Sequence, residues 1–279
     1  MSPAVARPRL LYVTDLTYPA RGRRYGDEDA HLSAALRDTY DVALCHPRDA
    51  AALLDSFDLC LVRNSGPVIH YREAYDAFRA AAHRTGARVH NPLTGRADMR
   101  GKQYLAELSR AGFPVIPTVD RRADLTRLPR AERYVIKPEA GADSIGLEIL
   151  ERQDLDALTF DDGTHLVQPH VDFRYEVSFF YVDRVFQYAL NAPDPERRWE
   201  LHRYEPTGRD LEFAQRFVDW NTLDHGIQRV DACRTREGEL LLVELEDLNP
   251  YLSLDLVDAQ LRDRFLTALR ASLRAVRDQ

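Results

Sequence analysis

The chain has 279 residues, 44% of them hydrophobic, which is enough to bury a large core in one domain or in two or three smaller ones. The formal net charge is -7 and the basic residues form no run, which argues against nucleic acid or an anionic membrane as partner. No apolar stretch approaches the roughly 18 residues of a membrane span, and the run 10–13 is too short for a signal peptide, so we expect a cytoplasmic protein.

The first third of the chain alternates strand and helix patterns. Short apolar runs predict strands, and longer stretches with helical spacing predict helices, in the order strand 9–15, helix 27–40, strands 41–45 and 57–64, helix 71–86 and strand 88–92. This order predicts a small parallel sheet covered by helices. The loops 15–26 and 63–71 would lie at the carboxyl ends of its strands, where ligands bind.

The rest of the chain reads as a helix, a series of strands and two further helices. Residues 97–112 predict a helix with Lys102 in its first turns, and residues 192–209 hold three prolines and predict a long functional loop. The predicted strands are 113–119, 133–138, 146–150, 165–171, 176–183, 184–191, 227–236 and 239–248, with 176–183 and 184–191 joined as an antiparallel hairpin. Helices are expected at 211–223 and 255–276.

Lysine is rare in this sequence: among 38 Lys and Arg residues, only Lys102 and Lys137 are lysines. Lys137 ends an apolar run and precedes a glycine-bounded loop in YVIKPEAGADSIGLEIL. A compact ammonium approaches an oxygen atom more closely than a wide guanidinium does, and the N–H groups of a glycine loop can cradle phosphate. We interpret this segment as a phosphate site, although neither GxxxxGK[ST] nor GxGxxG is present; the alternative is chance retention of two surface lysines.

Acidic residues recur in the segment VDACRTREGELLLVELEDLNPYL. Asp231 lies on one predicted strand, and Glu244 and Glu246, two positions apart, project from one face of the next. Carboxylates on such an apolar strand are costly unless they are solvated or hold a cation, and Mg²⁺ takes such oxygens when it shares its shell with phosphates. Arg229 shares the face of Asp231, and Asn249 follows at the same end. The alternative is an edge strand with a solvated acidic face.

The order of these features resembles the ATP-grasp superfamily over residues 95–255. The motifs that carry the resemblance are GKQYLAELSRAGFPVIPT, VIKPEAGADSIG, LVQPHV, YEVSFF and RVDACRTREGELLLVELEDLNP. They look closest to carboxylate-amine ligases such as D-alanine:D-alanine ligase and glutathione synthetase, and to compact bacterial amino-acid ligases. The resemblance implies an α/β (α+β) ATP-grasp fold with the nucleotide held between two antiparallel-sheet subdomains. Its parts would be an N-terminal βαβ pre-ATP-grasp domain at 1–94, a central subdomain with a glycine-rich lid at 95–170, and a C-terminal subdomain with the metal site at 171–279.

The resemblance also implies roles for individual residues in binding ATP. Lys102 and Lys137 would contact the phosphates, and Glu176 would take the ribose hydroxyls. The lid over the phosphates would include Gly141, Ser144 and Gly146, and the hinge along adenine would be Gln168, His170 and Val171.

The acidic segment would then bind two magnesium ions, with Mn²⁺ as an alternative. The ligands would be Asp231, Glu244 and either Glu246 or Asn249, and Arg229 would join Lys137 as a catalytic residue by steadying an acyl phosphate. The family usually ends in E-x-N, whereas this chain has E-x-E followed by Asn249, so the third ligand stays open.

Substrate-binding residues have weaker signals. Cationic side chains crowd the loop after the hairpin and could fork onto a substrate carboxylate: Arg197, Arg198, His202 and Arg203. Arg63, Asn64 and Ser65 end a strand and are candidates to line an acceptor pocket. The alternative for the cationic side chains is a solvated loop, and the alternative for these three residues is a simple turn. His70 and His202 are candidate bases for an incoming amine.

The activity that this resemblance implies is ATP-dependent ligation of a small carboxylic acid, such as an amino acid, to an amine, with release of ADP and phosphate. A carboxylate lacks a leaving group, and phosphorylation supplies one, so the protein's task is to position and neutralise anions. The alternatives are an intramolecular cyclo-ligase, modification of a protein or carrier-bound terminus, and a non-catalytic nucleotide-binding regulatory module. A homodimer is compatible with the family, and the sequence leaves the oligomeric state open.

Overall fold

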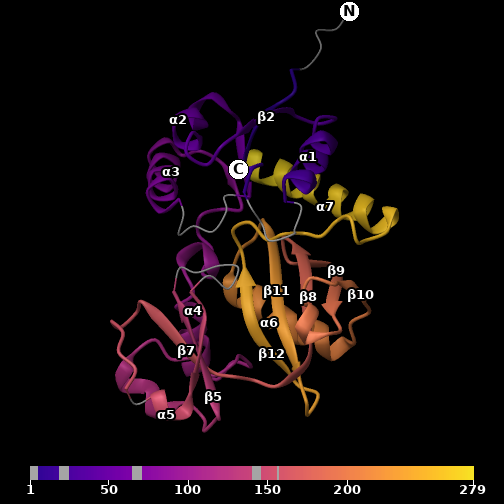
Figure 1. Cartoon of the computed structure of the whole chain (residues 1–279). Helices are drawn as coiled ribbons and strands as arrows, with labels where there is room; N and C mark the ends of the chain where they lie inside the picture. The colour runs from indigo at the N-terminus through magenta and orange to yellow at the C-terminus, as the bar shows by residue number, and fades with distance from the viewer. Residues whose placement is uncertain (1–5, 19–24, 65–70, 140–145, 156) are drawn as a thin grey trace, which may run out of the picture.

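The computed structural model describes residues 6–18, 25–64, 71–139, 146–155 and 157–279. This part of the chain contains three sheets, which draw on residues 9–90, 133–169 and 173–246 in turn. Figure 1 shows the first sheet with its helices at one end of the molecule and the other two sheets side by side at the opposite end.

The first sheet is parallel and has the strand order β2-β1-β3-β4. Its strands are β1 (Arg9–Thr14), β2 (Asp41–Cys45), β3 (Leu59–Asn64) and β4 (Val89–His90). Because side chains alternate along a strand, Leu10 and Tyr12 pack into one core cluster and Leu11 and Val13 into another. The first cluster is covered by α1 (Tyr25–Leu36) and α7 (Ala259–Arg277), and the second by α2 (Ala50–Leu53) and α3 (Arg72–Thr85).

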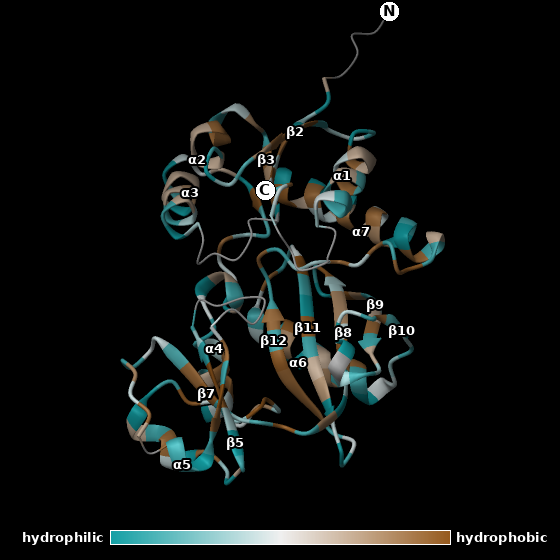
Figure 2. Ribbon diagram, in the orientation of Figure 1, coloured by the Kyte–Doolittle hydropathy of each residue, from teal (hydrophilic) through white to brown (hydrophobic). Residues whose placement is uncertain are grey.

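Helix α7, at the end of the chain, packs against this first sheet (Figure 1). Its buried residues Phe265, Leu269, Leu273 and Val276 recur at the spacing of one helix face. Figure 2 shows the corresponding alternation of hydrophobic and hydrophilic residues along the helix. Asp258 caps its start by accepting a hydrogen bond from the Leu261 N–H.

The other two sheets are antiparallel. The smaller has the order β6-β5-β7, with β5 (Arg133–Pro138), β6 (Glu148–Glu151) and β7 (His165–Pro169), and it contacts α5 (Arg152–Leu155). Helix α4 (Tyr104–Arg110) instead packs its buried residues into the core cluster of the larger sheet. The larger has the order β10-β9-β8-β11-β12. Its strands are β8 (Phe173–Val182), β9 (Val185–Ala192), β10 (His202–Tyr204), β11 (Ile227–Thr235) and β12 (Leu240–Glu246), and α6 (Gly208–Asn221) packs on one face.

Several predicted elements are confirmed, among them the strands at 41–45 and 133–138 and the hairpin of β8 and β9. The predicted strand at 113–119 is wrong: only the isolated bridges of Val115 with Leu242 and Val119 with Val167 form there. Pro114 and Pro117 lack the N–H that a ladder needs, which accounts for the difference.

Two further predictions need correction. Lys102 lies in a turn before α4, because the helix begins only at Tyr104, and so it is not in the helix's first turns. The segment 192–209 is also not a continuous loop, since β10 pairs with β9 through His202 and Asn191. A three-residue edge strand without apolar alternation leaves little signal in a sequence.

No helix in the described residues is long and apolar enough to cross a membrane.

Helix α6 provides a stability test because it begins with a capping box. The Thr207 side chain accepts from the Asp210 N–H, and the Asp210 carboxylate accepts from the Thr207 N–H at 3.0 Å. We expect Thr207→Ala to lower the free energy of unfolding by about 1 kcal/mol, and the melting temperature by about 2 to 4 °C, measured by circular dichroism. Thr267→Ala, which removes an exposed hydroxyl within α7, is the matched control, and an equal loss in both variants would contradict the assignment.

Candidate active site

The acidic residues predicted from the sequence meet on the face of the larger sheet that is turned away from α6. Val230 and Leu245 point into the core beneath α6, so the residues next to them on each strand point the other way. The strand register places Asp231 opposite Glu244 and Arg229 opposite Glu246. Two acid-bearing strands and one arginine therefore present their charged groups together.

Arg229 lies between two of these carboxylates. Its Nε donates to Asp231 Oδ1 at 3.0 Å, its Nη1 donates to the Tyr251 carbonyl at 2.9 Å, and its guanidinium also pairs with Glu246. Burial opposes the charge on Arg229, but Asp231 and Glu246 outweigh burial and raise its pKa. Ser178 on β8 donates to Asp231 Oδ1 at 2.6 Å, which fixes that carboxylate from the other side.

Lys102 neutralises the third carboxylate. Its Nζ lies 2.6 Å from Glu244 Oε1, and its side chain is 11% exposed. Burial raises the pKa of Glu244, but Lys102 and Lys137 more than offset this, so that the pKa of Glu244 is lowered overall. The same contact raises the pKa of Lys102 against the effect of burial. Both groups are therefore charged at neutral pH.

Lys137 is the lysine without such compensation. It lies on β5, and burial lowers its pKa to about 8, an effect strengthened by the nearby positive charges of Lys102 and Arg198 and opposed by Glu244. The structure thus brings both lysines of the chain to the acidic face. A further anion at this point would raise the pKa of Lys137 again, since opposite charge favours the ammonium form.

Gly146, which ends the predicted lid, has a backbone conformation that favours glycine. Gly146 has φ +73°, and a Cβ atom there would lie 2.8 Å from Pro138 Cγ, so a side chain would be strained and crowded. Gly141 and Ser144 lie outside the described residues.

The residues predicted to hold the adenosine part are placed as follows. Glu176, on β8, pairs with Arg198 Nε at 2.7 Å; burial raises its pKa, and Arg198 opposes that shift. Gln168 Nε2 donates to Thr118 Oγ1 at 2.8 Å. His170 and Val171 follow β7, on the segment that leads from the smaller sheet into the larger. Their contacts with a nucleotide stay predictions.

The predicted substrate residues are scattered. Arg63 is buried, donates to the Pro250 carbonyl at 2.8 Å, and lies 3.5 Å from Glu28. Asn64 ends β3, and Ser65 and His70 lie outside the described residues. Within the loop and β10, Arg197 pairs with Asp194 and Glu200, Arg198 with Glu176, Arg203 with Glu205 and Asp258, and His202 opens β10. Of these cations, Arg198 is the one whose charge affects Lys137.

Two components of the site were not found from the sequence. Ser178 lies 53 positions before Asp231, and only the register of β8 against β11 reveals their contact. Tyr251 follows the acidic segment, and its ring lies 4.5 Å from that of Tyr25 in α1. The tyrosines themselves carry no motif, so sequence offers no signal for this contact.

The chemistry of these groups fits magnesium with phosphates. Within the described ranges no group of three or more His, Cys, Asp and Glu is arranged as a ready metal site. Magnesium bound together with nucleotide needs only one or two carboxylates, because phosphate oxygens and water complete its shell. Asp231, Glu244 and Glu246 supply such oxygens, while Asn249 follows β12.

Known proteins were compared with the chain by sequence and by structure. Neither a scan against protein-family models nor a search of curated proteins found a match. Among solved structures, the D-cycloserine synthetase DcsG matches with a TM-score of 0.72 and 22% identity, over 94% of this chain and 99% of that one. D-alanine–D-alanine ligase from Bacillus anthracis, complexed with ATP, matches with a TM-score of 0.69 and 12% identity, over 99% of each chain. The ATP-grasp ligase PsnB, complexed with a precursor variant, Mg and ADP, matches with a TM-score of 0.65 and 14% identity, over 96% of this chain and 100% of that one.

These matches extend over nearly the whole chain, and the mixed α/β architecture with its antiparallel sheets agrees with them. The protein has the fold of the ATP-grasp ligases, as the order of its motifs implied.

A double-mutant cycle can measure how much the ion pair of Lys102 and Glu244 contributes to the free energy of unfolding. We expect Lys102→Met to lower the free energy of unfolding by about 2 to 4 kcal/mol at pH 7, because Glu244 loses its partner while largely buried. Adding Glu244→Gln should recover part of that loss, as measured by urea denaturation. The pKa of Glu244 is lowered in the folded protein. The ion pair therefore adds its full contribution to the free energy of unfolding at pH values above the usual pKa of a glutamate, and this contribution disappears as the pH falls through the lowered pKa.

The exposed pair of Arg236 and Asp172, 3.0 Å apart, is the control for this cycle. Exposed pairs contribute little, so a coupling as large there as at Lys102 would contradict our account of the buried pair.

Proposed function

We propose that the protein is an ATP-dependent ligase that joins a carboxylic acid to an amine through an acyl phosphate. The observation that carries the proposal is the convergence of both lysines with Arg229 and three carboxylates on one sheet face of an ATP-grasp fold. A site that combines fixed cations with acidic metal ligands suits a reaction between anions.

The reaction transfers the γ-phosphoryl group of ATP to a substrate carboxylate. A carboxylate oxygen attacks the γ-phosphorus and ADP leaves; the amine then attacks the acyl carbon, phosphate leaves, and the amine loses a proton. Magnesium bound at the acidic face would neutralise the phosphates. Lys137 and Lys102 would bind phosphate oxygens, and Arg229, fixed by its contacts with Asp231 and Tyr251, would hold the acyl phosphate.

The substrate class that we propose is an amino acid or a similar small acid, with an amine as acceptor. Two of the similar structures favour intramolecular closure as a second candidate: a macrocyclase, MdnC, bound with its precursor peptide, and the D-cycloserine synthetase, which is named for a cyclic compound. Both candidates share the acyl phosphate, and they differ only in whether acid and amine belong to one molecule.

The proposed domain boundaries are 1–94, 95–170 and 171–279.

Product analysis tests the chemistry directly. With MgATP, pooled amino acids and hydroxylamine, we expect ADP together with an amino-acid hydroxamate, because hydroxylamine captures an acyl phosphate. Dividing the pool then identifies the acid, and mass spectrometry separates a linked product from a ring. AMP with pyrophosphate would contradict the mechanism, and ATP binding without turnover across the substrate pools would favour the regulatory module. Arg229→Gln is the control for contaminating activity and should form no hydroxamate.

Lys137 can be tested through its size and its charge. Lys137→Arg should fold as the wild type does but lose turnover by about 100-fold, because a wide guanidinium displaces the phosphate from its reacting position. In the wild type, ATP affinity should fall as the pH rises above the pKa of about 8, where Lys137 loses its proton. Lys137→Met should bind ATP weakly without that pH dependence in calorimetric titrations. Full turnover in Lys137→Arg would remove the lysine from the mechanism.

A further inference from the structure

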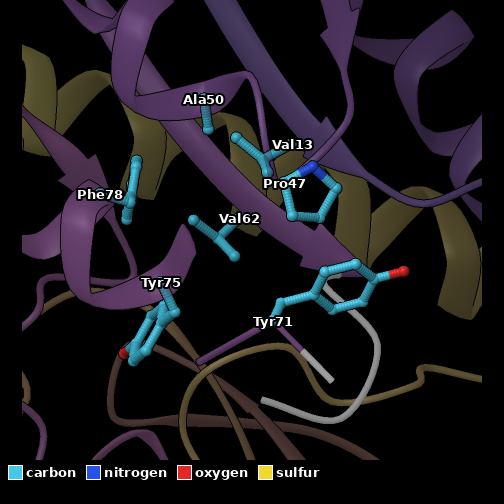
Figure 3. Close-up of a pocket in the computed structure, with 7 residues that line it drawn as sticks. All are labelled: Val13, Pro47, Ala50, Val62, Tyr71, Tyr75 and Phe78. Atoms are coloured by element: carbon cyan, nitrogen blue, oxygen red, sulfur yellow. The ribbon is translucent and has the colours of Figure 1, made fainter. Parts of the chain in front are cut away.

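The crevice between β1, β3, α2 and α3 is too small to select a ligand. It is lined mostly by residues of the core cluster on that side of the first sheet, Val13 and Val62 among them (Figure 3), and it has room for about 20 Å³, enough for about one water molecule. Charged side chains that can distinguish one ligand from another lie instead on the carboxylate face, the face of the larger sheet that carries Asp231, Glu244 and Glu246.

Glu176 lies on the carboxylate face, although it is not one of the three acids that meet there. It stands two residues before Ser178 on β8, and Ser178 donates to Asp231 on the neighbouring strand. Residues two apart on a strand share a face, whereas Val177 between them belongs to the core beneath α6. The Glu176 side chain is 21% exposed, so a ligand that enters this face can reach its carboxylate.

Arg198 reaches this carboxylate from the connection between β9 and β10. The connection, residues 193–201, leaves β9 at Ala192, which pairs with Glu176 in the sheet. Arg198 Nε donates to Glu176 Oε2 at 2.7 Å, and about half of the arginine side chain is exposed. The neighbouring Arg197 instead pairs with acids of the connection itself. Arg198 is therefore the arginine of this connection that crosses to β8.

Arg198 also lies close enough to Lys137 for its charge to act there. Burial and Lys102 are the main causes that lower the pKa of Lys137 to about 8, and Arg198 adds to their effect. The guanidinium thus stands between a carboxylate of the larger sheet and the lysine of β5. Like charges repel, so an anion that entered beside Lys137 would attract Arg198 and relieve its repulsion with the lysine.

A neutral ribose and Arg198 compete for the same carboxylate. Ribose hydroxyls would donate to the oxygens of Glu176, one of which already accepts from Arg198. A hydrogen bond between two ionised groups is about twice as strong as one between neutral groups, so hydroxyls alone displace the guanidinium poorly. A polyphosphate changes this balance, because it offers Arg198 an anion in exchange for Glu176.

We propose that Arg198 is a specificity-determining residue that selects nucleoside polyphosphates over nucleosides. It pairs with Glu176 in the empty protein and moves to the phosphates when they bind, which leaves the carboxylate to the ribose. The inference rests on the proposed function, in which Glu176 takes the ribose hydroxyls. Adenosine then binds only to the fraction of molecules in which the ion pair is open, whereas ATP opens the pair itself.

Adenosine and MgATP should respond in opposite directions to the loss of Arg198. In Arg198→Gln we expect adenosine to bind about five-fold more tightly than in the wild type, because Glu176 is no longer occupied. MgATP should bind about ten-fold more weakly, because its phosphates lose a cation. Ligand-observed NMR titration measures adenosine and calorimetry measures MgATP, both without acid or amine. Adenosine binding that is weaker or unchanged in Arg198→Gln would overturn the proposal.

Three further variants separate selection from a structural role of the ion pair. Glu176→Gln breaks the same pair but also weakens the ribose acceptor, so adenosine should bind no more tightly than in the wild type. Arg198→Lys keeps the charge and should restore most of the preference for MgATP. Arg184→Gln is the matched control: it breaks an exposed pair with Asp219, 2.7 Å apart, beside the turn of the β8–β9 hairpin, and should leave both affinities unchanged.

The pattern across these variants decides the assignment, provided that thermal unfolding shows each of them to be folded. Adenosine binding that improves equally in Arg198→Gln and Glu176→Gln would mean that Glu176 does not receive the ribose, and the proposal would be wrong. The same conclusion follows if Arg184→Gln changes both affinities as much as Arg198→Gln does.

The hydroxamate assay on the same preparations separates this inference from the proposed function. Opposite shifts of adenosine and MgATP affinity in Arg198→Gln, without ADP formation by the wild type, support the role of Arg198 and contradict the ligase. Hydroxamate formation by the wild type, together with equal adenosine affinity in the wild type and Arg198→Gln, contradicts the role of Arg198 alone.

Discussion

Charge balance on one face of a sheet is the constraint on which this structure depends. Asp231, Glu244 and Glu246 project together from two neighbouring antiparallel strands, where holding three carboxylates close together and partly out of water costs free energy. Arg229 and Lys102 offset that cost from two directions, one from the same strand and one from the turn before α4. Removing either cation would leave carboxylates largely buried and uncompensated, so the position of α4 and the register of β11 against β12 are energetically linked.

Much of this face follows from local spacing. Residues two apart on a strand share a face, so the pairs Arg229 with Asp231 and Glu244 with Glu246 could be predicted from the sequence alone. Both strands are also strongly apolar on their other face, which makes the element type clear. Composition singles out Lys137, because lysine is rare in this chain and Lys137 stands at the end of an apolar run.

The remaining features depend on contacts between distant segments, which no local pattern encodes. Ser178 reaches Asp231 only through the pairing of β8 with β11, and Lys102 reaches Glu244 because the chain turns before α4. The segment 113–119 has the apolar character of a strand, yet its prolines prevent a ladder. Arg63 lies near the carboxyl end of β3, where ligand-binding residues are common, but its guanidinium donates to the Pro250 carbonyl.

The segment after β12 holds the first sheet and the carboxylate face together. Glu28 in α1 accepts from the Leu252 and Leu254 N–H groups, while Arg63 in β3 donates to Pro250. Burial raises the pKa of Glu28 to about 7, and Arg63 together with these N–H groups opposes that shift, so the contact is strongest when Glu28 is ionised. Tyr251 lies within this anchored stretch and accepts from Arg229. The same few residues thus fix the first sheet against the larger one and orient the arginine of the proposed active site, so the position of Arg229 is a property of the fold itself.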